Sequence, residues 1–185
     1  MDSTKKDTVD IKKEVLKALP YIILITVIII INKIFIFNTT IPSSSMESTL
    51  NIGDCLIGNR MAYSFKNPER GDIITFKAPD DDSLIYVKRV IGIAGDIVRI
   101  DNGKVYRNGE LLNEDYIKDP MKEDEFSEIF EVPEGCVFVM GDNRNNSFDA
   151  RFWNNHYVST DKIISKLEIK YMDGLKNTLC FKIIK

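Results

Sequence analysis

Three consecutive serines, Ser43, Ser44 and Ser45, follow the dipeptide Ile41-Pro42 and precede Met46. A serine-rich stretch beside a proline is typical of a flexible linker, and taken alone this stretch favours that interpretation. A serine hydroxyl becomes a nucleophile only where a neighbouring base takes its proton. The choice between linker and nucleophile therefore depends on whether the rest of the chain supplies a base.

Two residues could be that base. The chain has one histidine, His156, in the polar run WNNHYVS (153–159), which is typical of an exposed turn. Lys88 lies in the apolar run LIYVKRV (84–90). If its side chain points inward, burial lowers its pKa and leaves part of the amine neutral. Lys88 and Arg89 are adjacent and face opposite sides of a strand, so at most one of the two charges can point outward on a given face.

The elements that must position these residues are mainly strands. Apolar alternation and turn residues predict strands in six ranges: 55–65, 72–78, 84–93, 96–112, 136–141 and 161–172. Asn102-Gly103 and Asn108-Gly109 are hairpin-type dipeptides that divide the fourth range into a meander, and NTLCFKIIK (177–185) is expected to form a last strand. The sequence predicts a mainly β, antiparallel domain with no helix after residue 37.

The stretch before this domain is the most apolar part of the chain. Residues 19–37 read LPYIILITVIIIINKIFIF, and as a helix they would be about 28 Å long, enough to cross a bilayer. The alternatives are a cleaved secretory signal, which is usually shorter and followed by small residues, and a buried core helix, which is rarely apolar on every side. Lys33 can extend its amine to the outer headgroups.

Lysine bias sets the expected orientation. Five lysines precede the stretch, whereas the next basic residue after Lys33 is Arg60. With the apolar stretch, the bias predicts a cytoplasmic segment (1–18), a transmembrane helix (19–37) and an extracytoplasmic β-rich domain (38–185), in a single-pass protein of the plasma membrane.

Composition excludes other classes of function. A net charge of −3 and a pI near 5.3 provide no basic surface for nucleic acid. Cys55, Cys136 and Cys180 are far apart, form no CxxC pattern and allow at most one disulfide. They are interpreted as structural, and no metal or cofactor is expected.

Four segments, taken in order behind one N-terminal span, resemble a known family. They are IPSSSM (41–46), RGDIITF (70–76), YVKRVIGIAGD (86–96) and GDNRNNSFDAR (141–151). Together they resemble the ordered boxes of type I signal peptidases, over the chain from the anchor to about Lys166. The bacterial branch is the more similar one, because the branch of the endoplasmic reticulum has histidine where Lys88 stands.

The resemblance implies a role for each matching residue. Ser45, directly before the methionine, is the nucleophile, and Lys88 is the general base. Ser43 helps to form the oxyanion hole with the backbone N–H of Ser45, and Ser147 orients the lysine amine. Charged residues of the last box brace the site: Asp142, Arg144, Asp149 and Arg151. Apolar residues beside the pair are the expected lining of the substrate pocket: Ile41, Met46, Tyr86 and Val87.

The chain departs from the family pattern at three positions. Ser44 stands at a usual glycine and disturbs the oxyanion hole if that glycine needs a positive φ or close backbone approach. Ser48 replaces a usual proline, which is expected to loosen the turn that enters the domain. Ala150 replaces the serine of a common DSR triplet. None of the three removes a group that transfers a proton.

The resulting hypothesis is a membrane-anchored serine endopeptidase that removes signal peptides after a small-x-small motif, through an acyl-enzyme. Its expected partners are the signal peptides of translocating preproteins, the bilayer and the secretion translocon. Eight residues separate Phe37 from Ser45, so the nucleophile lies at most roughly 29 Å from the end of the predicted span. The segment 113–134 is expected to be an accessory loop.

Two alternatives remain open. One is a Ser-Lys protease of the self-cleaving repressor type, which carries a DNA-binding domain where this chain has an anchor. The other is a catalytically impaired, membrane-tethered paralogue that binds secretory proteins, for which the Ser44 substitution is the main motivation.

Overall fold

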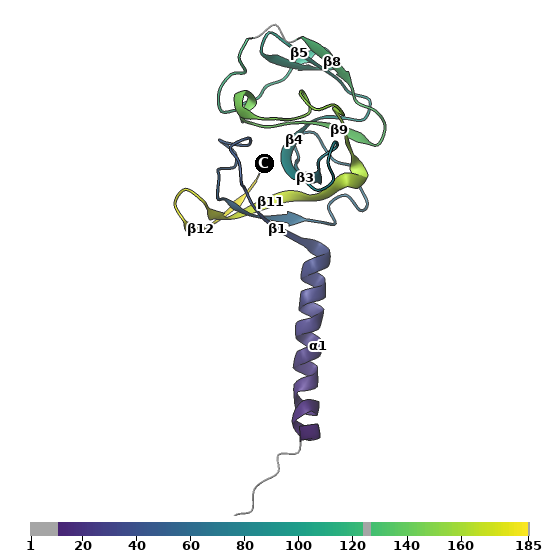
Figure 1. The fold of residues 1–185 in the computed structure, drawn as a ribbon, viewed down its shortest axis with the longest axis vertical. Coiled ribbons are helices and arrows are strands. Elements are labelled where there is room, and N and C mark those ends of the chain that lie inside the picture. Colours follow the sequence, from purple (N-terminus) through teal and green to yellow (C-terminus); the bar gives the residue numbers. More distant parts are fainter. Residues whose placement is uncertain (1–10, 124–126, 185) are drawn as a thin grey trace, which may run out of the picture. The chain divides into compact units, whose positions relative to one another are not determined.

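The computed structural model describes residues 11–123 and 127–184. The chain divides into two compact units, a helical unit that ends at Phe35 and a β unit that begins at Ile36 (Figure 1). Most of the predicted cytoplasmic segment, including Lys5 and Lys6, lies outside the described residues.

The first unit contains one helix, α1 (Ile11–Phe35). Its part from Glu14 to Phe35 is long and apolar enough to cross a membrane, by length and composition. The helix ends two residues before the predicted end of the span, because Ile36 and Phe37 belong to strand β1 and pair with Asn59 and Gly58. Apolar β-branched and aromatic residues suit both helix and strand, and here pairing with a distant strand decides.

The β unit consists of two antiparallel sheets (Figure 1). The larger sheet has the order β1-β2-β11-β3-β4-β9-β10, with β12 paired to β11. Its strands are β1 (Ile36–Thr40), β2 (Cys55–Asn59), β3 (Ile73–Lys77), β4 (Ile85–Ile93), β9 (Cys136–Met140), β10 (Val158–Ser159), β11 (Ile163–Asp173) and β12 (Thr178–Ile183). The smaller sheet has the order β7-β6-β5-β8, with β5 (Ile97–Asp101), β6 (Lys104–Arg107), β7 (Glu110–Leu111) and β8 (Glu128–Glu131). The predicted mainly β, antiparallel class is confirmed.

Local sequence predicted the hairpins well and some strands poorly. Both Asn-Gly dipeptides form the expected turns, with φ of 47° and 70° at Asn102 and Gly103, and of 54° and 86° at Asn108 and Gly109. The predicted strand 55–65 ends at Asn59, where the chain turns. Strands β1, β8 and β10 were not predicted, and β8 lies within the segment 113–134. Among the described residues of the β unit, the only helical segments are two short 3-10 turns, Arg144–Asn146 and Thr160–Lys162.

A small hydrophobic cluster lies under the three serines. Met46 and Leu50 are fully buried against Leu56, Ile73 and Leu167. Burying one such side chain contributes about 1.5–3 kcal/mol. The serines are therefore part of an anchored turn and do not form a flexible linker.

The two Asn-Gly turns provide a matched pair of substitutions. A Cβ at Gly103 would lie 2.6 Å from the carbonyl oxygen of Met121, whereas nothing lies within 4 Å of a Cβ at Gly109. Both glycines have positive φ, so either change to alanine costs about 1–2 kcal/mol for the left-handed backbone. We expect Gly103→Ala to lower the free energy of unfolding by about 2 kcal/mol more than Gly109→Ala, since only it displaces backbone. Denaturant unfolding of the full chain in detergent measures both, and equal losses would contradict this packing.

Candidate active site

Ser45 and Lys88 meet in the β unit. Ser45 lies in the turn after β1, and Lys88 lies within β4, between its neighbours β3 and β9. The Lys88 side chain is buried, and its Nζ donates a hydrogen bond of 2.8 Å to Ser45 Oγ. This distance is within the reach required of a base that takes the serine proton.

Burial controls the charge of the lysine. Desolvation lowers the pKa of Lys88 to about 8, and it outweighs the nearby carboxylates. Asp149 and Asp142 raise the pKa of the amine, while Arg151 lowers it. A useful fraction of the amine is therefore neutral near pH 8.

The other two serines have different contacts. Ser43 Oγ lies 3.4 Å from Ser45 Oγ. Ser44 accepts hydrogen bonds from two asparagine side chains, Asn146 Nδ2 to its Oγ at 2.8 Å and Asn143 Nδ2 to its carbonyl at 3.1 Å. Ser44 is not among the described non-glycine residues with positive φ, so a serine at this position carries no left-handed strain.

Ser147 does not make the contact that the resemblance implies. Its hydroxyl is buried and has no hydrogen-bond partner within the described parts of the chain, so the expected bond to the Lys88 amine is absent in this structure. It still lies beside the nucleophile, because a Cβ at Gly141 would overlap both Ser147 Oγ and the Ser45 carbonyl. Gly141 thus allows the two segments to approach closely.

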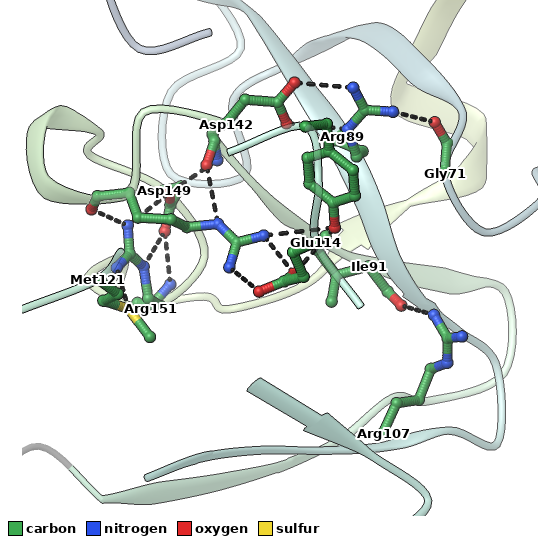
Figure 2. A network of polar contacts seen from close by, with 12 residues as sticks. Gly71, Arg89, Ile91, Arg107, Glu114, Met121, Asp142, Asp149 and Arg151 are labelled. Carbon is green, nitrogen blue, oxygen red and sulfur yellow. Dashed lines mark hydrogen bonds and ion pairs between the residues drawn. The ribbon is translucent and has the colours of Figure 1, made fainter. Parts of the chain in front are cut away.

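The charged residues of the last box form buried pairs. Asp142 accepts two hydrogen bonds from Arg89, at 2.9 and 2.7 Å, and one from Thr49. Asp149 accepts two from Arg151, at 2.8 and 2.9 Å (Figure 2). Arg89 and Lys88 are both buried, on opposite faces of β4, so neither charge points outward.

The third arginine of this network is held by a residue that the sequence analysis did not identify. Arg144 donates to both carboxylate oxygens of Glu114, at 2.6 and 2.5 Å (Figure 2). We call residues 114–121 the strap. The Tyr116 ring lies 4.1 Å from the Arg89 guanidinium, and Lys118 Nζ lies 3.0 Å from a carboxylate oxygen of Glu47. The strap therefore contacts both the serine turn and the last box.

Sequence reasoning left these residues within an accessory loop. Glu114 precedes Arg144 by thirty positions, and no local pattern connects them. Asn143 was also missed, although its backbone N–H donates to the Ser45 carbonyl at 3.0 Å. Its place in the quoted segment GDNRNNS was the one available signal.

A hollow of about 300 Å³ opens beside the pair, and we call it the Ser45 hollow. Its lining includes Ser43, Ser45 and Lys88 together with all four predicted pocket residues, Ile41, Met46, Tyr86 and Val87. Further lining residues come from β1 and the start of β4, including Phe37, Thr39 and Ile85.

The single histidine has another environment. The His156 ring packs against Phe130, 5.0 Å between centroids, and its Nδ1 lies 2.6 Å from the Ala150 carbonyl. It is half-buried and not exposed as predicted. No contact with Ser45 occurs among the described residues. Ala150 itself is buried in the main core, where alanine, unlike the usual serine, needs no hydrogen-bond partner.

Fold and site together define an antiparallel β domain in which a serine hydroxyl is hydrogen-bonded to a buried lysine amine. The family model described as "Signal peptidase, peptidase S26" matches residues 12–172. Signal peptidase I of Bacillus caldolyticus is 35% identical over 153 residues, which cover 75% of this chain and 81% of that protein. The chain belongs to the signal peptidase family, peptidase S26.

Other relatives are similar over a smaller share of their length. Probable signal peptidase I-2 of Synechocystis sp. is 40% identical over 136 residues, covering 71% of this chain and 61% of that protein. A second Synechocystis protein, probable signal peptidase I-1, is 44% identical over 120 residues, 61% of this chain and 60% of that protein. The chain thus spans about three fifths of the length of these relatives. A crystal structure of a signal peptidase I from Enterococcus faecalis is 32% identical and covers 55% of this chain and 97% of that chain, with a TM-score of 0.47.

Ser48 has a backbone conformation that the usual proline of the family could not adopt. Its φ is 94°, whereas the proline ring fixes φ near −65°. Its hydroxyl donates to the Tyr116 carbonyl of the strap at 2.7 Å. The serine therefore does more than loosen the turn: it permits another turn and ties it to the strap.

We expect Ser48→Pro, which restores the usual residue, to lower the free energy of unfolding by about 2–3 kcal/mol, because φ is incompatible and the hydrogen bond is lost. Ser48→Ala and Ser48→Gly both remove the hydroxyl, so the glycine variant should be about 1 kcal/mol more stable than the alanine variant, since only glycine relieves the positive φ. Thermal unfolding in detergent measures all three. A Ser48→Pro variant more stable than the wild type would contradict the positive φ at this position.

Lys88 should reduce stability at neutral pH. Its pKa is about 8 in the folded protein and about 10.4 for a free lysine, so the unfolded chain binds more protons between these values. The penalty is present at pH 7 and fades as the pH rises from about 8 to about 10. Lys88→Met should raise the free energy of unfolding by about 3 kcal/mol at pH 7 and by much less at pH 10. Lys66→Met, on the surface, is the control. If Lys88→Met raised the free energy of unfolding by the same amount at every pH, the amine would not be desolvated.

Proposed function

We propose that this protein is a membrane-anchored serine endopeptidase that removes signal peptides from secreted preproteins. The observation that carries the proposal is the 2.8 Å hydrogen bond between Ser45 Oγ and a lysine amine whose pKa burial has lowered to about 8. Membership of the signal peptidase family and the names of its relatives support the reaction class. The residue roles below are part of the proposal.

The reaction is acyl transfer. Neutral Lys88 takes the proton from Ser45 as its oxygen attacks the scissile carbonyl, and the Ser43 hydroxyl with the Ser45 backbone N–H stabilises the oxyanion. The protonated amine then gives its proton to the leaving nitrogen, and the signal peptide stays as an ester on Ser45. A water activated by Lys88 releases it. Ser147 would orient the amine in the substrate complex, where a change of its side-chain rotamer would bring its hydroxyl, unpaired among the described residues, to Lys88.

The Ser45 hollow would select small residues before the cleaved bond. Its apolar walls, Ile41, Met46, Tyr86 and Val87, lie beside the nucleophile. Signal peptides carry small residues at the cleavage site, and a hollow of about 300 Å³ shared by several residues leaves little room for large side chains. An extended substrate could also pair with an exposed strand edge, which adds affinity without sequence preference.

The anchor would place this chemistry at the membrane. The helix α1 would span the plasma membrane with the lysine-rich N-terminus in the cytoplasm and the domain from Ile36 outside. Ser45 follows Phe35 by ten residues, so the chain limits its distance from the helix end to roughly 36 Å. The partners would be translocating preproteins, the bilayer and the translocon.

We expect purified wild-type chain in detergent to cleave a preprotein after a small residue. Ser45→Ala should abolish cleavage, and Lys88→Ala should slow it roughly 10²- to 10⁴-fold, because it removes the base. The rate should rise with pH and reach half its maximum near pH 8, where half of the amine is neutral. Amino-terminal sequencing of the product and a pH series of kcat/KM make the measurement.

Exposed residues of the same types serve as controls, and Ser64→Ala and Lys66→Ala should retain the wild-type rate. Cleavage by Ser45→Ala would show that the nucleophile is another residue. A rate that falls steadily above neutral pH would exclude a neutral amine as the base. A wild-type chain that binds the preprotein and cuts nothing would establish the tethered binding protein in place of the peptidase.

A further inference from the structure

A second hollow lies next to the Ser45 hollow, and we call it the aromatic hollow. Its volume is about 200 Å³, and its apolar walls are Ala78, Pro79, Leu84, Tyr86, Phe148 and Trp153. Drug-sized ligands usually occupy about 300–1,000 Å³. A hollow of this size and lining suits one large apolar side chain.

The two hollows share one wall. Tyr86 lines both of them. Its ring lies 5.7 Å from Lys88 Nζ and stacks on Trp153 at 5.8 Å between centroids. Phe148, another wall of the aromatic hollow, directly follows Ser147 in the chain. The aromatic hollow is therefore adjacent to the site of the proposed reaction.

The proton transfer to the leaving nitrogen indicates which part of the substrate lies against the Tyr86 ring. In the proposed reaction the Lys88 amine gives its proton to the leaving nitrogen, which must come within about 3.2 Å of it. Tyr86 and Lys88 alternate along β4 and so project from the same face. The chain that begins at the leaving nitrogen thus starts beside Lys88 and the Tyr86 ring. Residues before the cleaved bond occupy the other hollow.

One wall of the aromatic hollow, Phe148, is an exposed aromatic ring. Phe148 is 62% exposed and Phe152 is 51% exposed, and their rings stack with centroids 6.5 Å apart. Large apolar groups that are exposed together commonly mark a binding surface. A substrate side chain in the aromatic hollow would contact Phe148 and Leu84 and remove part of their apolar area from water.

A second observation concerns unpaired polar atoms. Within the described residues, two buried side-chain atoms lack a hydrogen-bond partner, Ser147 Oγ and Trp153 Nε1. One precedes a wall of the aromatic hollow in the chain, and the other belongs to a wall. Such atoms are costly to leave unpaired and are concentrated at functional sites. An apolar substrate side chain cannot pair either atom, so the two atoms mark a functional neighbourhood and are not themselves contacts of that side chain.

The rim also carries negative charge. Asp80 and Asp81 line the aromatic hollow, and hydrogen bonds from Ser83 lower the pKa of Asp81. Asp80 accepts from the backbone N–H groups of Asn154 and Asn155. Two acidic side chains at this rim repel a negative charge and disfavour an acidic substrate residue.

We propose that the aromatic hollow binds a large apolar side chain of the mature protein, carried by one of the first three residues after the cleaved bond. An extended chain advances about 3.3 Å per residue, so this range matches the passage from Lys88 past the Tyr86 ring. The inference rests on the proposed peptidase function and deepens it. The site thus binds side chains of the substrate on both sides of the cleaved peptide bond.

The test uses peptides with one small-x-small motif and three residues after it that are all alanine, or alanine with a single leucine or aspartate at each position in turn. The full chain in detergent should show kcat/KM roughly tenfold higher for leucine than for alanine at one of the three positions, and lower for aspartate there. Phe148→Ala and Leu84→Ala should each bring the leucine-to-alanine ratio close to one. Ile129→Ala removes an exposed apolar side chain of β8 that lines neither hollow, and it should keep the ratio.

The ratio within each variant is insensitive to changes in the amount of folded enzyme, so a partly unfolded variant still gives a result. Equal rates for all peptides with the wild type would overturn the inference while leaving the peptidase intact. A leucine preference that survives both wall substitutions would overturn it as well. If the wild type cuts none of these peptides and no preprotein, the proposed function fails, and the inference fails with it.

Discussion

The buried amine of Lys88 is the constraint around which the rest of this structure is organised. An ammonium group in an apolar sheet is costly, whereas a neutral amine is not. Strand β4 lies between β3 and β9, and the Lys88 side chain that it carries is buried, so water solvates the charge poorly. The small core under Met46 and Leu50 fixes Ser45 within 2.8 Å of that amine. The same burial that destabilises the protonated lysine makes it a base near neutral pH.

The arginine–carboxylate pairs near Lys88 bear on its pKa. An unpaired carboxylate near Lys88 would favour the ammonium and restore an ordinary pKa. Asp149 and Arg151 shift the pKa of Lys88 in opposite directions, and Asp142 is paired with Arg89. Desolvation is the largest effect on the pKa of the amine. Buried charges thus lie close to the site, and the pKa of Lys88 is nevertheless lowered.

Further polar contacts connect segments that are far apart in the chain. The strap joins the last box through Glu114 and Arg144 and joins the serine turn through Ser48 and Lys118. Asn143 connects the last box directly to the Ser45 carbonyl. Nucleophile and supporting residues are therefore connected by polar contacts across the chain, and Tyr86 lines both hollows beside them.

The sequence by itself determined the features that depend on local patterns. The apolar run fixed the helix, the two Asn-Gly dipeptides fixed their hairpins, and alternation identified most strands. Ordered boxes located Ser45 and Lys88, which the structure brings together. The tertiary structure alone decided where α1 ends, because β1 is defined by pairing with β2. It also decided the φ of Ser48, the unpaired Ser147 hydroxyl, and the partners Glu114 and Asn143. These depend on contacts between residues tens of positions apart, and residue type and spacing along the chain do not identify the partner in such a contact.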